Sequence, residues 1–251
     1  MLVVISTSIL STNKKPYKMA RLLLSVTFLA IILTGCSSEK KIIKFAAVPD
    51  ETYANPNLKK FFKENRNPNI VLRVPNNNDK ATSNTSTNRN NDVLYNTIEK
   101  ELLKENFSVR DRGLFNELLS KSATSDYSKI KELTNTDIIL EVVSIDPSVL
   151  YTTNKVTTIT PKKEAESIGN IDYKEKGASV EYKVILVKNN EIAGTYKFNY
   201  KPCPDGCELT TFKFTGKKRS LKPVLRETVE INTMEEFLKI TTKQLINSFR
   251  Q

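Results

Sequence analysis

Three cysteines are the residues of this 251-residue chain whose type and spacing could do chemistry, because the sequence contains no histidine. The lack of imidazole excludes Ser-His-Asp and Cys-His catalytic arrangements and any histidine-based metal site. Cys36 directly follows Leu33-Thr34-Gly35, whereas Cys203 and Cys207 flank a three-residue turn. The first arrangement points to lipid attachment and the second to a disulfide, so the chemistry that the sequence indicates is covalent modification. No catalytic residue or cofactor is expected.

The residues before Cys36 stand in the order that a secretory signal peptide requires. Four basic residues between positions 14 and 21 precede an apolar run, Leu22 to Leu33. That run is too short to span a bilayer core of about 30 Å as a helix. Residues 33–36 match the bacterial lipobox, so we predict a signal peptide over 1–35 and a lipid such as palmitate on Cys36. The alternative is a buried helix that ends in Gly-Cys, and either Met1 or Met19 can be the start.

The Cys203–Cys207 pair is predicted to form a disulfide. Pro204, Asp205 and Gly206 are turn formers that can bring the two Cβ atoms into bridging range. An exported compartment also favours the bond. The rival interpretation is a metal or redox site, but no histidine and no second cysteine pair supplies further ligands.

The basic charge indicates which partners suit the chain. Removing the leader, which holds four basic residues and no acidic one, lowers the formal net charge from +11 to +7. A moderate positive charge suits work beside anionic lipid or acidic polymers. Nucleic acid is not expected as a partner, because the predicted compartment is wrong and no tryptophan is present to stack on bases. The densest basic run contains Lys217, Lys218 and Arg219. It is a candidate partner-binding site, with a solvated loop as the alternative.

Composition divides the mature chain into three parts. Residues 36–68 are predicted as a lipidated tether with some packed structure, 69–146 as an α/β domain, and 147–251 as a β-rich extension with a C-terminal helix. An asparagine-rich loop follows the strand-like stretch Asn69 to Val74 and extends to Asp92, which is predicted to cap the next helix. Long loops are often functional, so this loop is a second candidate contact, with a disordered insert as the alternative. Its candidate residues are Asn76, Asn77, Asn78 and Asn84.

The hydrophobic pattern predicts the order of elements in the middle part. Apolar residues at helical spacing follow Asp92, Asp111 and Ser125, which predicts three helices. A short strand is predicted near Phe107, and an apolar central strand is predicted to end at Ile145. This order predicts an α/β unit with a partly parallel sheet. Strand-like stretches then follow, including one with alternating aromatics that is expected to face Phe212 and Phe214 across the Cys203–Cys207 turn. The C-terminal helix is expected to start with a cap at Asn232 or Thr233, with Met234, Phe237, Leu238, Leu245 and Phe249 as its apolar stripe.

The middle part, from Ile98 to Ile145, resembles the domain shared by CsgG-type curli-secretion lipoproteins and lipoprotein activators of penicillin-binding proteins. It is also similar to the N-terminal domain of the Tol translocation protein. The matching residues are Phe107, Val109, Asp111, Arg112, Leu114, Leu118, Leu119, Thr136, Asp137, Ile138 and Ile139. The resemblance implies an α+β fold. It comprises a small α/β unit with a mixed sheet, like an anticodon-binding domain, extended by an antiparallel β-meander and a C-terminal helix.

Two functions from different classes follow from these features. The first is a non-enzymatic binding or scaffold lipoprotein of a cell-envelope assembly, lipid-anchored at the periplasmic face of the outer membrane and contacting an envelope protein. Ser37 and Ser38 after the lipidated cysteine fit outer-membrane sorting. The second is a protomer of an oligomeric secretion channel of the curli type. The resemblance implies that an oligomer is possible in either case.

Overall fold

The computed structural model describes residues 39–74, 85–121, 127–158, 166–167, 172–214, 217–220 and 227–250. The chain divides into two compact units. The larger unit comprises residues 41–209 and 222–251, and the smaller comprises residues 1–40 and 210–221. The described helices are α2 (Pro56–Glu64), α3 (Thr85–Lys104), α4 (Arg112–Lys121), α5 (Tyr127–Thr134) and α6 (Ile231–Arg250), with a 3-10 turn η2 (Val187–Asn189).

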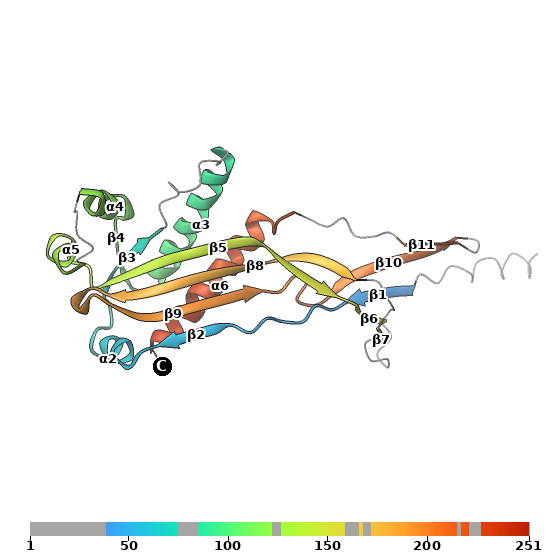
Figure 1. The fold of residues 1–251 in the computed structure, drawn as a ribbon, viewed down its shortest axis with the longest axis horizontal. Helices are drawn as coiled ribbons and strands as arrows, with labels where there is room; N and C mark the ends of the chain where they lie inside the picture. The colour runs from blue at the N-terminus through green and yellow to red at the C-terminus, as the bar shows by residue number, and fades with distance from the viewer. Residues whose placement is uncertain are drawn as a thin grey trace, which may run out of the picture. The chain divides into compact units, whose positions relative to one another are not determined.

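A six-stranded mixed sheet forms the centre of the larger unit (Figure 1). Its strand order is β2 (Glu51–Ala54), β9 (Glu191–Tyr200), β8 (Tyr173–Leu186), β5 (Ile138–Thr153), β3 (Asn69–Arg73) and β4 (Ser108–Arg110). Strand β3 is parallel to β4 and to β5, and the remaining pairs are antiparallel. Helices, a mixed sheet, an antiparallel meander and a C-terminal helix confirm the predicted α+β fold.

Strand β5 connects the two parts that composition separates. It runs through the predicted boundary at residues 146/147 and pairs with β8 from Ile138↔Leu186 to Thr153↔Tyr173. The register shifts twice, after Val142 and after Asp146. Such irregularities bend a strand and increase its twist. The parallel part and the meander therefore share one continuous sheet.

Side chains alternate between the two faces of the sheet along each strand, so the buried residues form two core layers, one on each face. In β3, Ile70 and Leu72 join the main core, whereas Val71 between them faces the second layer. The main core also receives buried side chains from α2, α3 and α6, and α6 crosses this face of the sheet (Figure 1). Phe115 of α4 packs with Val71 and Ile139 on the other face. Apolar residues on both sides explain why β3 and β5 read as continuous apolar runs.

The interval predicted as a tether contains folded elements of the larger unit. Strand β2 pairs with β9, and α2 buries Leu58 and Phe62 in the main core. The Asn55 side chain accepts a hydrogen bond from the Leu58 backbone N–H at 2.9 Å, and Pro56 occupies the first turn. Both features favour a helix start. Residues 51–64 are therefore an integral part of the fold, which corrects the tether prediction for them.

Two predicted helix starts are wrong and one is confirmed. Helix α3 begins at Thr85, so Asp92 lies inside it and does not cap it, and residues 85–92 are not loop. Helix α6 begins at Ile231, ahead of the predicted caps. Asp111 caps α4 as predicted, because its Oδ1 accepts a hydrogen bond from the Leu114 backbone N–H at 2.6 Å. All five predicted stripe residues of α6 are buried.

The shorter strands pair outside the six-stranded sheet. Strand β1 (Glu39–Ile43) pairs with β6 (Lys155–Thr158), which also pairs with β7 (Glu166–Ser167). Strand β10 (Cys207–Phe214) pairs with β11 (Lys217–Ser220), so the basic run is a strand and not a loop. Phe212 is in register with Arg219, whereas β9 pairs with β8 and β2. The expected pairing of the β9 aromatics with Phe212 and Phe214 is therefore wrong.

Candidate functional site

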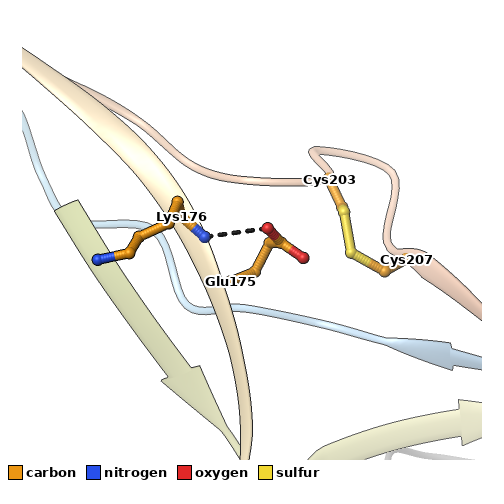
Figure 2. The surroundings of a disulfide bond; sticks show 4 residues. All are labelled: Glu175, Lys176, Cys203 and Cys207. Atoms are coloured by element: carbon orange, nitrogen blue, oxygen red, sulfur yellow. Dashed lines mark hydrogen bonds between the residues drawn. A yellow bond between two sulfur atoms is a disulfide. The ribbon is translucent and has the colours of Figure 1, made fainter. Parts of the chain in front are cut away.

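Cys203 and Cys207 form the predicted disulfide, with their Cα atoms 5.3 Å apart (Figure 2). The bond closes a tight turn after β9, in which the Gly206 N–H donates to the Cys203 carbonyl at 2.7 Å. Cys203 has a φ of 47°, in the left-handed region that residues with a Cβ rarely adopt. Figure 2 shows the Glu175 side chain of β8 directed toward this turn, where it accepts a hydrogen bond from the Lys176 backbone N–H. The turn is thus fixed covalently and by backbone geometry.

Gly206 is required at its position in this turn. Its φ is +99°, and a Cβ added there would lie 2.1 Å from Ile42 Cγ2. Only glycine combines this conformation with such a close approach. Cys207, which follows Gly206 at the end of the turn, packs against the small cluster that contains Ile43 and Tyr151. The turn therefore has a fixed position against the rest of the larger unit.

A groove of about 510 Å³ lies beside the disulfide turn. Three separate segments line it: Asp50 just before β2, the end of β9 with the turn, and α6 from Asn232 to Gln244. Phe198 and Phe237 are buried side chains at its base, and Pro204 of the disulfide turn contributes to its wall. The full lining is Asp50, Phe198, Asn199, Tyr200, Lys201, Pro204, Asn232, Thr233, Glu236, Phe237, Ile240, Thr241 and Gln244.

The groove has an apolar interior and a polar rim. The Tyr200 ring lies 5.7 Å from the Phe237 ring, and burial raises the pKa of the Tyr200 hydroxyl above its usual value. Ile240 is 50% exposed although it is a large aliphatic residue on α6. Asp50 stands at the rim and accepts a hydrogen bond from the Asn199 backbone N–H at 2.9 Å. An apolar hollow with a few polar groups at its edge is typical of a binding site.

Arg112, one of the residues that carry the family resemblance, holds α4 against α3. Its guanidinium lies 3.7 Å from Glu99, 3.9 Å from Asp92 and 5.3 Å from the Tyr95 ring centroid. Burial raises the pKa of the Glu99 carboxyl, and the Arg112 charge partly offsets that rise. These contacts join two helices, so the Asp111–Arg112 pair has the packing and capping role that the sequence predicts.

The structure separates the predicted site residues into those it describes and those it does not. Cys36 and the four asparagines at 76, 77, 78 and 84 lie outside the described residues. Lys217, Lys218 and Arg219 lie together on β11. The groove was not predicted. The residue in the sequence that indicates such a groove is Ile240, because it is apolar but lies outside the predicted apolar stripe of α6.

The described part of the chain has two further properties that bear on function. Across the described residues, no three or more acidic, cysteine or histidine side chains gather where they could hold a metal ion. None of the described helices has both the length and the apolar character needed to cross a membrane.

Comparisons with known proteins add a limited structural finding. No protein-family model and no curated protein matches the sequence. Among solved structures, a PelC dodecamer from Paraburkholderia phytofirmans matches with 8% identity and a TM-score of 0.33, covering 80% of this chain and 96% of that chain. A single-residue variant of the same PelC dodecamer matches with 8% identity and a TM-score of 0.28, covering 82% and 95%. A likeness at this level carries no argument about function.

Proposed function

We propose that this chain is a membrane-anchored periplasmic lipoprotein that acts as a non-enzymatic binding or scaffold component of a cell-envelope assembly. In this proposal its lipid is attached at Cys36, and it resembles the CsgG-type lipoproteins in its central α/β part. The signal-peptide pattern supports export, and the Cys203–Cys207 disulfide fits an oxidising compartment.

The groove beside the disulfide is the observation that carries the binding role. We propose that it seats an apolar side chain of an envelope protein, because its base is aromatic and Ile240 is left exposed at its side. Large buried apolar anchors in preformed hollows commonly dominate the energy of protein interfaces. The disulfide and Gly206 hold the Pro204 wall in place, so little conformational entropy is lost when the partner binds.

Site-specific crosslinking in intact cells tests this function. A photoreactive phenylalanine analogue replaces Ile240 in one variant and Leu133 of α5 in a matched control, since Leu133 is also an exposed aliphatic residue on a helix. We expect the variant at position 240 to capture one envelope protein, identified by mass spectrometry, and the variant at position 133 to capture none. Ile240→Arg is expected to abolish co-purification of that protein, whereas Leu133→Arg should not.

Two results would contradict the proposal. Equal capture from both positions would show that the groove has no special role, and a folded, anchored protein with no crosslink at position 240 would remove the binding site. Exclusive capture of other copies of this chain in an SDS-resistant ring would favour the channel alternative instead. The asparagines at 76, 77, 78 and 84 and the basic residues Lys217, Lys218 and Arg219 remain predicted contacts for the same method.

A further inference from the structure

A second hollow, of about 400 Å³, lies at the C-terminal ends of α2 and α6 and has a different chemistry from the groove. Its base is formed by Phe62 and Phe249, whose rings stack with centroids 4.6 Å apart. The two helix ends lie next to each other in the larger unit (Figure 1). The complete lining is Lys59, Phe62, Lys63, Asn65, Arg66, Asn67, Phe249 and Arg250.

The lining has four positive charges and no acidic residue. Arg250 forms an ion pair with Glu105 at 2.9 Å. By contrast, Lys59, Lys63 and Arg66 are exposed and have no ion-pair partner among the residues that the structure describes. Three uncompensated cations around one hollow produce a local positive potential that attracts anions.

The helix ends explain only part of this charge. Lys63 and Arg250 stand in the last turns of α2 and α6, where cations offset the partial negative charge of the helix C-terminus. Lys59 lies one turn earlier, and Arg66 follows the helix. The charges of Lys59 and Arg66 are therefore not accounted for by the helix ends.

We propose that this hollow binds an acidic saccharide, meaning a sugar that carries carboxylate or phosphate groups. Lysine and arginine match the acidic groups. The exposed Asn67 amide can hydrogen-bond to hydroxyls. The volume suits a small ligand or the end of a sugar chain. A peptide that docks an apolar side chain fits less well, because Phe62 and Phe249 are only 8% and 2% exposed and leave no open apolar slot.

Within the larger unit, the hollow lies far from the strand end at which β1 pairs. Phe249 packs on Tyr196 of β9. Tyr196 is paired in register with Tyr182 of β8, and Tyr182 is paired in register with Val142 of β5. From Val142, β5 continues to Thr153, a span of about 35 Å at the usual rise per residue. Strand β6, with which β1 of the anchored segment pairs, follows at that far end of β5 (Figure 1).

Calorimetric titration of the mature full-length protein in neutral detergent tests the proposal. The probes are trigalacturonic acid, neutral maltotriose, inorganic phosphate and a soluble short-chain phosphatidylglycerol. We expect trigalacturonic acid to bind and the other three to bind at least about tenfold more weakly. Lys59→Gln with Lys63→Gln should weaken binding of trigalacturonic acid by about tenfold or more.

The matched control is Lys60→Gln with Lys188→Gln, which removes the same charge from exposed lysines outside this hollow. It should leave affinity unchanged, and circular dichroism establishes that both variants are folded. Equal loss in both variants would show a non-specific charge effect and overturn the proposal. So would absence of binding, equal binding of maltotriose, or equal or tighter binding of phosphate or of phosphatidylglycerol. None of these outcomes depends on the partner groove, so failure here would leave the proposed function untouched.

Discussion

At the residue scale, the disulfide turn shows how a covalent bond and a glycine together fix one wall of the groove. The sequence places two cysteines around Pro-Asp-Gly, and this predicts both the bond and the turn. What it does not predict is the close approach of Gly206 to Ile42, because β1 lies far away along the chain. That contact makes Gly206 sensitive to any substitution that adds a Cβ.

Gly206→Ala should lower the free energy of unfolding by about 2 kcal/mol, because alanine is strained at positive φ and its Cβ would clash with Ile42. Urea unfolding under non-reducing conditions measures the change. Asp205→Ala is the control in the same turn, where the side chain is exposed, and it should change stability by less than about 0.5 kcal/mol. Equal effects of the two substitutions would refute the role assigned to Gly206.

Asp111 provides a second residue-scale test, because its carboxylate caps α4. Asp111→Ala removes the acceptor for the Leu114 N–H and should cost about 1 kcal/mol of stability. Asp111→Asn keeps an oxygen at the cap and should retain most of that stability, measured by the same urea titration. If both variants were as stable as the parent protein, the capping bond would contribute nothing.

At the element scale, the sequence predicts strands β4, β5 and β9 because their apolar content is continuous or alternating, whereas β11 falls on the basic run and has no such pattern. The sequence pattern does not predict helix α2, although Asn55 and Pro56 are start signals, because its nine residues are dominated by lysine and phenylalanine. The sequence predicts a loop for the first two turns of α3, because threonine, serine and asparagine favour caps and turns over helix interiors. Ile240 is a signal in the sequence for an exposed apolar site, but the sequence does not show the groove as a whole, since three segments distant in the chain line it.

The packing of α6 on the sheet predicts a loss of stability at high pH. Tyr182 is fully buried, and burial raises its pKa to about 12, although hydrogen bonds to Thr242 and Thr241 act in the opposite direction. The ordinary tyrosine pKa is about 10, so the unfolded chain ionises first. The stabilising effect of the buried neutral hydroxyl is complete below pH 10 and is lost as the pH rises toward 12.

Tyr182→Phe should therefore make the fall in unfolding free energy between pH 10 and pH 12 shallower than in the parent protein. Tyr53→Phe, at an exposed position on β2, is the control and should leave the parent curve unchanged. Urea unfolding at several pH values gives both curves. Parallel curves for the parent protein and Tyr182→Phe would show that this hydroxyl does not control alkaline stability.

At the scale of the whole molecule, two hollows of different chemistry stand along α6. The apolar groove lies along α6 from Asn232 to Gln244, and the basic hollow lies at its last turn. The same helix buries its apolar stripe in the main core, and two stripe residues, Phe237 and Phe249, also line the groove and the basic hollow. If both proposals hold, a helix that lines two distinct binding surfaces suits a scaffold component, because one ligand can be held while another is engaged.

The scaffold role requires an anchor, and Cys36→Ala tests it. Without the cysteine thiol no lipid can be attached, so the variant should accumulate as an unprocessed precursor or as soluble protein. Fractionation of cells followed by mass spectrometry of the N-terminal peptide measures location, processing and lipid mass together. Ser37→Ala is the matched control, because it leaves the thiol in place and should still be processed and membrane-bound. A Cys36→Ala protein that remained in the membrane at mature size, with no difference in lipid mass from the parent, would show that Cys36 is not the anchor. The lipoprotein proposal would then fail, whereas the groove and the basic hollow would remain testable in the soluble protein.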